Sequence, residues 1–447
     1  LGALLGAATL VVSQAGYNAI AEIRTLEKPA VLVPAYRKTE DQRARALRLA
    51  RAGAAVLAKP EARAIADRIE ALLGSEEKLA AMSRAHRSVP LVPKNREAAE
   101  AVLRPVWMGR ETRVKKVAIV AHDFAPKLGG METVARALAT SLVARGVAVR
   151  VYTTKRLGAR SAAGLGPDVV EPLYPPLPPP ARIDLESDLS STIDAALRDA
   201  PDVIHLCHAG LGPWIPALRA ALPCVVTAHV HGNDLLAPWV FHDGPAEKYR
   251  EAQIAGLSAA DAVVCVSRFS RDLARAKGVS LDVLHTVENG VDPERFRPEA
   301  LPGDVDLARR LGLSDEDEVV LTVSRLAPRK GHRTMLEAIA RLAKQRPRLK
   351  FVFTGASDAL RSELAELATV LGIAPRVIPA GFVPDAELPA LYRLARVFAL
   401  LASDAEDDVE GFGVALLEAA ASGLPAIATR TGGVPEAVVD RETGILV

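Results

Sequence analysis

Short apolar runs alternate with longer helical stretches along most of the chain that follows residue 116. The runs are rich in Val, Ile and Ala and end at Gly, Pro or polar residues, which is typical of strands buried on both faces. Helices between such strands indicate the crossovers of a parallel sheet. The pattern predicts a first series of strands at residues 117–121, 149–153, 203–207, 225–228 and 263–266.

A second series of the same kind follows the loop at residues 293–302. Its strands are predicted at residues 319–324, 351–354, 377–380, 397–401 and 426–428. In the first series, a helix over residues 131–145 precedes Gly146, a residue typical of helix C-caps. The proline-rich stretch 172–180 predicts an extended surface loop. We therefore expect two doubly wound α/β units.

The first hundred residues form a separate region. Apolar runs at 9–12 and 30–34 predict two strands, and Glu40-Asp41-Gln42 opens a basic helix. Because the arginines of residues 43–51 scatter around this helix, they indicate a solvated surface, with membrane contact as the alternative. Residues 95–103 predict polar helices, and the pattern breaks at residues 104–113.

Composition narrows the class of protein. A chain of 447 residues suffices for two or three domains, and a net charge of +2 gives no global nucleic-acid signal. Cys207, Cys224 and Cys265 lack metal-ligand spacing and are expected to be buried, reduced thiols of a cytoplasmic protein. No run reaches the ~18 apolar residues of a membrane span.

The two ends of the chain carry expectations of their own. The apolar start, residues 1–12, has no basic lead, which argues against a signal peptide. The chain begins without Met and stops within the strand-like run 444–447. We therefore expect a piece of a longer protein.

Two glutamates stand out near the end of the chain. Glu418 lies in an Ala/Leu-rich stretch that starts at Val414 and ends at Gly423, which predicts a largely buried helix. A carboxylate there costs free energy unless a partner satisfies it. Glu410 precedes a Gly-Phe-Gly turn whose amides favour anions at the helix start. Both could face one phosphate-bearing, polyhydroxyl ligand; alternatively, Glu418 pairs with an Arg in the core and Glu410 is a solvated loop charge.

A cationic loop supports the ligand hypothesis. Arg325 and Lys330 follow the predicted strand 319–324, at the strand end where open α/β sheets bind ligands. Arg offers a planar fork to phosphate oxygens and Lys a compact charge. The pair could neutralise a diphosphate leaving group, although a surface loop with ordinary cations is the simpler interpretation.

Five motifs, taken in order, resemble the retaining glycosyltransferases of family 4. Three are Gly-Gly-Met-Glu at 129–132, Glu-Asn-Gly-Val-Asp at 288–292 and Ser-Arg-Leu…Lys-Gly at 324–331. Glu-Gly-Phe-Gly…Glu at 410–418 and Thr-Gly-Gly-Val-Pro-Glu at 431–436 complete the set. The resemblance implies the GT-B fold, with two Rossmann-like domains facing a cleft, and spans residues 115–447. The acceptor-side domain is then expected at 117–295 and the donor domain at 296–447, truncated before its last strands and closing helix.

The resemblance implies transfer of a hexose-type sugar from a UDP- or GDP-type nucleotide sugar, with retention of configuration. The acceptor would be a saccharide or lipid-linked molecule of polysaccharide or glycolipid biosynthesis, and no cofactor or metal is expected. Asp315-Glu316-Asp317 is read as a loop ahead of a strand, and residues 404–408 as a solvated acidic loop. The implied donor-binding residues are Gly129, Gly130, Arg325, Lys330, Glu410, Gly411, Phe412, Gly413 and Glu418.

The family's site histidine has two candidates here. A Thr-x-His spacing selects His229, whereas His-Gly-Asn-Asp selects His231, which we favour. A zinc site from the two is not supported, because no third ligand is nearby. His208 and Asp123 are read as strand-end polar residues. The implied catalytic residues are His231, His229, Arg325, Lys330 and Glu410.

Residues 1–90 resemble the carboxyl-terminal half of family 28 transferases. That family's nucleotide-binding positions match Ser13, Ala15, Gly16 and Glu22. Because no facing domain accompanies them, we expect a partial half-domain at 1–104 with a vestigial site, joined by a linker at 105–116. Two other classes stay open for the whole chain, namely another GT-B enzyme (a nucleotide-sugar epimerase or a phosphorylase) and a non-catalytic binding module.

Overall fold

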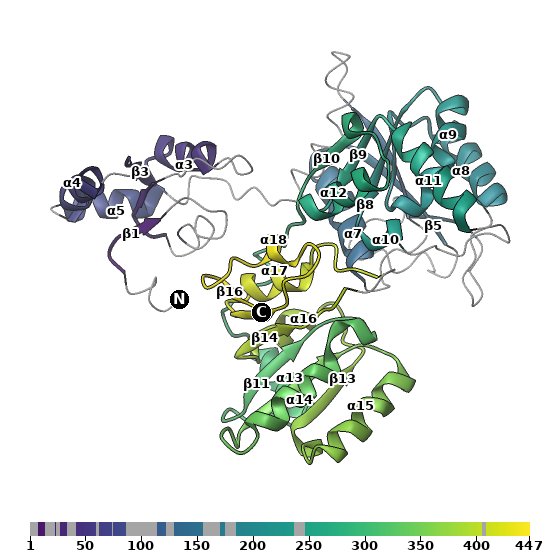
Figure 1. Cartoon of the computed structure of the whole chain (residues 1–447). Coiled ribbons are helices and arrows are strands. Elements are labelled where there is room, and N and C mark those ends of the chain that lie inside the picture. Colours follow the sequence, from purple (N-terminus) through teal and green to yellow (C-terminus); the bar gives the residue numbers. More distant parts are fainter. Residues whose placement is uncertain are drawn as a thin grey trace. The chain divides into compact units, whose positions relative to one another are not determined.

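The computed structural model contains two compact units, residues 1–92 and residues 93–447. Three sheets are formed by the described residues, and every strand pair in them is parallel (Figure 1). The described residues are 8–13, 23, 27–33, 42–59, 62–73, 75–85, 114–121, 129–154, 170–174, 185–236, 246–404 and 408–447.

The first unit has a three-stranded sheet with the order β1-β2-β3. Its strands are β1 (Val11–Ser13), β2 (Ala30–Leu32) and β3 (Ala55–Leu57), and its helices are α3 (Gln42–Arg51), α4 (Ala62–Leu73) and α5 (Glu76–Ala85). The two predicted strands and the basic helix are confirmed, with ends shifted by one to two residues. The sequence prediction missed β3, which completes a small core around Leu32 and Leu49.

The larger unit begins with a seven-stranded sheet of order β10-β9-β8-β7-β4-β5-β6. The strands are β4 (Lys116–Val120), β5 (Ala148–Thr154), β6 (Val170–Tyr174), β7 (Val203–Leu206), β8 (Val225–Val230), β9 (Ala262–Cys265) and β10 (Leu284–Thr286). All five predicted strands are confirmed. Val117 and Ile119 enter one apolar cluster and Ala118 enters another, so β4 is buried on both faces as the continuous apolar run indicates.

The two strands that the prediction missed, β6 and β10, are the edges of this sheet. The expected loop over 172–180 is wrong at its start, because β6 includes Pro172 and continues to Tyr174. Pro172 opposes Thr153 of β5, and an edge strand tolerates a residue that lacks an N–H donor. Residues 175–180 lie outside the described residues.

Helices pack beside this sheet (Figure 1). They are α7 (Gly130–Val143), α8 (Leu185–Asp199), α9 (Ile215–Ala221), α10 (Asn233–Leu236), α11 (Ala246–Ser258) and α12 (Arg268–Ala276). The predicted end of α7 is confirmed, since Gly146 has φ +73° just beyond the helix. Residues 95–113 lie outside the described residues.

The second sheet of the larger unit has six strands in the order β13-β12-β11-β14-β15-β16. The strands are β11 (Glu318–Thr322), β12 (Leu349–Thr354), β13 (Val377–Gly381), β14 (Val397–Leu400), β15 (Ala426–Ala428) and β16 (Gly444–Leu446). The helices are α13 (Pro302–Arg310), α14 (His332–Leu342), α15 (Asp358–Val370), α16 (Leu388–Arg393), α17 (Val414–Ala421) and α18 (Val434–Ala437). The five predicted strands and the helix that begins at Val414 are confirmed.

The strand order of each sheet shows where a ligand-binding crevice is expected. In the second sheet the chain turns outward in opposite directions from β11 and β14, which are neighbours. In the first sheet β4 and β7 have the same relation. Ligands of open parallel sheets bind at such switch points, outside the carboxyl ends of the strands. The domain boundaries at residues 104, 116 and 295 stay predictions. Among the described residues, no helix is both long and apolar enough to cross a membrane.

Candidate active site

The cationic loop after β11 is packed tightly at its carboxyl end. Pro328–Lys330 forms a short 3-10 turn, and Gly331 follows with φ +75°. A Cβ on Gly331 would lie 2.1 Å from the carbonyl oxygen of Leu401, just after β14, so only glycine fits there. Arg325 is exposed, whereas the Lys330 side chain is only 11% exposed. The loop therefore presents one exposed cation and one that is largely buried.

Glu410 lies on the loop that follows β14, and its side chain is 12% exposed. It forms a short ion pair with the Lys330 ammonium, and Arg329 Nη1 donates to the same carboxylate at 2.8 Å. Burial by itself would raise the pKa of Glu410, but Lys330 and Arg329 hold it below its ordinary value. The alternative that Glu410 is a solvated loop charge is wrong. Its ion pairing brings together two residues that the sequence proposed separately.

Arg329 was missed by the sequence analysis. Its side chain is 8% exposed, and its Nε lies 2.5 Å from Asp408 Oδ1 in an ion pair. Asp408 therefore does not belong to a merely solvated acidic loop, because a buried guanidinium needs its charge. The available signal was an arginine beside Lys330 and an excess of acid in residues 404–408, but only the fold pairs them.

Glu418 sits inside α17 and is 9% exposed. The Tyr392 hydroxyl donates to Glu418 Oε2 at 2.6 Å, and Tyr392 is fully buried. Burial raises the pKa of Glu418, and the Tyr392 hydrogen bond opposes this rise. The expected partner within the core was an arginine; the structure supplies a tyrosine. Glu418 Oε2 therefore has a hydrogen-bond partner within the protein.

The Gly411-Phe412-Gly413 turn leads from Glu410 into α17. Phe412 is 3% exposed and packs in the core of the second sheet, so its ring anchors the turn. Because the ring is buried, Phe412 can contact a nucleotide-sugar donor only through its main chain. Gly411 packs against the first sheet, since a Cβ there would lie 1.6 Å from the carbonyl oxygen of His231. Loops from both sheets of this unit thus meet at the turn.

Three histidine side chains lie close together on β7 and at the end of β8. Thr227, His229 and His231 alternate along β8 and its end, so their side chains share one face. His205 of β7 joins them: its Nε2 lies 2.8 Å from His229 Nδ1 and its Nδ1 lies 2.8 Å from Thr227 Oγ1. The rings of His229 and His231 stack with centroids 5.2 Å apart.

Burial separates the two candidate histidines. His229 is 2% exposed, and burial, with His205 and His231 nearby, lowers its pKa well below the ordinary value. Burial and His231 lower the pKa of His205 to about 3. His231 is half-buried, and its Nε2 lies 2.9 Å from the carbonyl oxygen of Cys207. Of the two rings, that of His231 is the more exposed.

The Gly-Gly turn before α7 is partly occupied. A Cβ on Gly129 would lie 2.1 Å from Glu132 Oε2, so this carboxylate covers Gly129. Gly130 is exposed and has open space around its Cβ position. Of the predicted pair, Gly130 offers the accessible amide. His208 is buried at the start of a 3-10 turn, and Asp123 lies outside the described residues.

The expected site in residues 1–90 and the expected burial of the three cysteines are each found only in part. Ser13 is half-buried at the end of β1, whereas Ala15, Gly16 and Glu22 lie outside the described residues. The three cysteines are free, but Cys224 is only half-buried. Within the described ranges, no three His, Cys, Asp or Glu side chains are grouped to hold a metal ion.

Known sequence families match the three regions in order. The profile of the glycosyltransferase family 28 carboxyl-terminal domain matches residues 1–101. The profile of glycosyltransferase family 4 matches residues 128–295, and that of glycosyl transferases group 1 matches residues 306–447.

Two solved structures have a similar fold. Anabaena HepE, in complex with UDP-glucose, aligns with a TM-score of 0.59 at 23% identity over 74% of this chain and 85% of its own. Sucrose-phosphate synthase from Thermosynechococcus elongatus aligns with a TM-score of 0.61 at 23% identity, over 74% and 86%. Together with the two parallel sheets of the larger unit, these alignments confirm the GT-B fold.

Curated relatives are closer in sequence. A GDP-mannose-dependent alpha-(1-6)-phosphatidylinositol monomannoside mannosyltransferase of Mycolicibacterium smegmatis is 34% identical over 337 residues, 74% of this chain and 84% of the relative. A D-inositol 3-phosphate glycosyltransferase of Xylanimonas cellulosilytica is 30% identical over 373 residues, 75% and 85%. Identity at this level over most of a relative's length shows that the chain belongs to the family 4 glycosyltransferases.

Proposed function

We propose that this glycosyltransferase moves a mannose-type hexose from a guanosine diphosphate sugar to an inositol-containing, lipid-linked acceptor, with retention of the anomeric configuration. The donor is taken from the relative of Mycolicibacterium smegmatis, whose name specifies GDP-mannose, and the acceptor from the inositol in the names of both relatives. A UDP-hexose is the competing donor, because Anabaena HepE binds UDP-glucose.

One observation carries the proposal. Lys330 and Glu410, from loops after β11 and β14, are in contact, and the turn that follows Glu410 packs against His231 at the end of β8. A cation, a carboxylate and a turn with main-chain amides therefore lie at the carboxyl ends of β11 and β14, and the turn contacts the main chain of His231 at the end of β8. A sugar diphosphate needs this combination, since its phosphates bind cations and amides while its hydroxyls bind carboxylate and imidazole.

The leaving diphosphate is stabilised by Arg325, Lys330 and the amide of Gly130 in this proposal. Arg325 is exposed and can turn toward a phosphate, whereas Lys330 is already aimed inward by its ion pair. Burial, with the neighbouring charges of Arg329 and Arg325, lowers the pKa of Lys330, although Glu410 opposes this change. An entering diphosphate would add negative charge beside Lys330 and stabilise its ammonium form, so charge is neutralised where it develops.

The sugar is held by Glu410 and by the turn amides. Arg329 keeps Glu410 ionised even when Lys330 contacts the diphosphate, because both cations share the same carboxylate oxygen. Glu418 is proposed to bind the donor ribose through Oε1, since Tyr392 occupies Oε2.

His231 contributes a hydrogen-bond acceptor. A carbonyl oxygen can only accept, so the contact between His231 Nε2 and Cys207 O selects the tautomer in which Nε2 carries the hydrogen. Nδ1 then offers a lone pair to a hydroxyl of the donor sugar or the acceptor. In the retaining reaction, the acceptor attacks the anomeric carbon from the face that the diphosphate leaves, and the diphosphate takes the acceptor proton.

The test is release of nucleoside diphosphate by the purified chain. We expect GDP release from GDP-mannose that rises when a phosphatidylinositol mannoside is added, and NMR of the product should show the anomeric configuration of the donor. An epimerase would interconvert the donor without release, and a phosphorylase would require inorganic phosphate. Binding of every donor with no turnover would contradict the proposal and favour a non-catalytic module.

A further inference from the structure

The segment Thr-Gly-Gly-Val-Pro-Glu at 431–436 has no part in the chemistry proposed above. It nevertheless packs against the turn at Glu410–Gly413, called the donor turn below because it is proposed to bind the donor sugar. The amide of Gly433 donates to the carbonyl oxygen of Glu410 at 2.8 Å. Helix α18 begins at Val434, and Glu436 lies in its first turn. The segment thus supports the turn on one side and extends toward the first sheet on the other.

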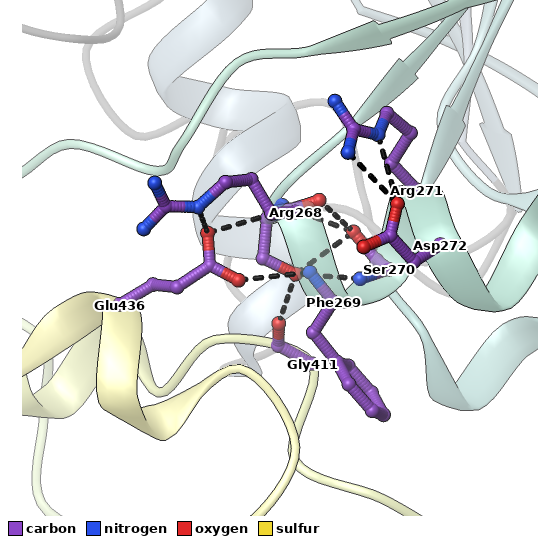
Figure 2. A network of polar contacts seen from close by, with 8 residues as sticks. Arg268, Phe269, Ser270, Arg271, Asp272, Gly411 and Glu436 are labelled. Carbon is purple, nitrogen blue, oxygen red and sulfur yellow. Dashed lines mark hydrogen bonds and ion pairs between the residues drawn. The ribbon is translucent and has the colours of Figure 1, made fainter. Parts of the chain in front are cut away.

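Glu436 binds the amino terminus of α12, a helix of the first sheet's domain (Figure 2). Its Oε1 accepts from the amide of Phe269 at 2.8 Å, and its Oε2 accepts from the amide of Arg268 at 2.8 Å and from Arg268 Nε at 3.2 Å. The Glu436 side chain is 9% exposed. A carboxylate in this position satisfies free helix amides and interacts favourably with the helix dipole.

Ser267, the residue before α12, makes the second link. Its hydroxyl is fully buried and donates to the carbonyl oxygen of Gly411 at 2.7 Å, while it accepts from the amide of Ser270 at 2.8 Å. Figure 2 shows the Gly411 carbonyl directed at this helix start, beside the Glu436 contacts. One hydroxyl therefore caps α12 and holds the donor turn.

We propose that Glu436 and Ser267 are positioning residues that tie the Glu410–Gly413 turn to the strand ends of the first sheet, so that Glu410 and His231 address the same substrate. This inference rests on the proposed function for its catalytic consequence. The contacts themselves join residues 267–269 of one sheet's domain to Gly411 and Glu436 of the other. Neither residue lies on the loop that carries Arg325 and Lys330, so both act on geometry rather than on charge at the diphosphate.

Substitutions can separate positioning from donor binding. Glu436→Gln keeps the size of the side chain but turns an NH₂ donor toward N–H donors, so at least one of the three contacts is lost and the others are weakened. Ser267→Ala leaves the Gly411 carbonyl oxygen without its hydroxyl partner and removes a helix cap. Ser267→Thr keeps the hydroxyl. Asp272→Asn is the matched control, because Asp272 lies on the same helix and pairs with Arg271 at the surface.

The experiment measures GDP affinity and kcat separately in the full chain. For Glu436→Gln and Ser267→Ala we expect GDP affinity within about twofold of the parent and kcat lower by roughly tenfold, the pattern of a lost transition-state contact. Ser267→Thr should recover most of kcat, and Asp272→Asn should match the parent. Unchanged kcat in both variants of an active parent, or parallel loss of GDP affinity, would overturn the inference.

A second readout does not depend on turnover. Spin labels at Glu251→Cys and Glu366→Cys, exposed sites on α11 and α15, report the distance between the two domains in a Cys224→Ser background. We expect one narrow distribution in the parent and a broader one in Glu436→Gln. If no donor is turned over, the proposed function fails, whereas a distribution unchanged by Glu436→Gln refutes the positioning role.

Discussion

The two sheets of the larger unit carry different kinds of polar groups at the carboxyl ends of their central strands. At the ends of β11 and β14, Arg329, Lys330, Glu410 and Asp408 form a cluster of full charges, three of them largely buried. At the ends of β7 and β8, the polar groups are the buried rings of His205 and His229 with the half-buried His231. One region buries ions and the other buries neutral hydrogen-bonding groups.

Physical chemistry explains the contrast. A buried carboxylate stays ionised only beside compensating cations, and Glu410 has two. Burial lowers the pKa of His205 and His229, so both rings are uncharged and each keeps one donor and one acceptor nitrogen. The ionic region suits a substrate with phosphates, and the neutral region suits hydroxyl groups. This difference supports the proposal that cations of the second sheet bind the diphosphate and that His231, at the end of the first, binds a hydroxyl.

The largest expected effect breaks the ionic side. Lys330→Ala and Arg325→Ala should each lower turnover by about 10²–10³-fold, because a stabiliser of the developing diphosphate charge is lost. Steady-state GDP release is the measurement, and circular dichroism checks the fold. Lys344→Ala, which removes an exposed lysine, is the control. Near-normal turnover in both variants would remove these residues from the site.

Arg329→Gln tests whether the cluster is held by its most buried cation. We expect the free energy of unfolding to fall by about 3 kcal/mol, since Glu410 and Asp408 lose a common partner in a largely buried site. Urea denaturation measures the change. Arg333→Gln, in an exposed pair with Glu363, should stay within about 0.5 kcal/mol of the parent. Equal effects of the two substitutions would show that the cluster contributes no more than a surface pair.

The two glutamates should divide binding from reaction. Glu418→Gln is expected to weaken affinity for bare GDP, because it alters the group proposed to bind the ribose. Glu410→Gln should leave that affinity nearly intact and lower kcat, since its contact with the sugar is made mainly in the transition state. Calorimetric titration with GDP decides between them. The reverse pattern would exchange the two roles, and no change in either variant would make both residues structural.

The pH dependence of stability should distinguish the two regions. The pKa of Glu410 is lowered on folding, so its contribution is present above the unfolded value of about 4.3 and is lost only as pH falls further. His205 has a pKa of about 3 when folded and about 6.5 when unfolded, so protons favour the unfolded chain from pH 6.5 down to 3. Its contribution to stability is therefore lost within that window.

His205→Gln makes this prediction measurable. Below pH 6, the fall in unfolding free energy should become less steep by about 1.4 kcal/mol for each pH unit. Urea denaturation from pH 7.5 to 4.5 gives the slope, and the offset at pH 7.5 reports packing alone. Parallel curves for parent and variant would mean that His205 is protonated in the folded protein.

The smallest expected effect concerns the first unit. Deletion of residues 1–106 should leave the transferase activity of the remainder largely unchanged, because every residue proposed for the reaction lies in the larger unit. GDP release from equal concentrations of both proteins is the measurement. Loss of activity in a folded, monodisperse deletion variant would mean that the half-domain contributes to the site.

Local pattern accounts for much of what was predicted. The central strands of both sheets were located because strands buried on both faces are continuous apolar runs. Edge strands β6 and β10 were missed, since an edge has one neighbour and tolerates Pro172 in place of an apolar run. Arg325, Lys330, Glu410 and Glu418 were singled out because a charge inside or beside an apolar element is unusual on its own.

The sequence by itself determined the order of strands and helices, the family motifs and the charged residues that such elements cannot bury unpaired. Only the tertiary structure decided which residues these charged groups contact. Glu410 meets Lys330 and Arg329, Glu418 meets Tyr392, and Glu436 meets the start of α12. The physical reason is that strand and helix patterns are local, with periods of about two and 3.6 residues. Pairing of groups distant in the chain depends on strand order and on how loops of two sheets approach, which no local period encodes.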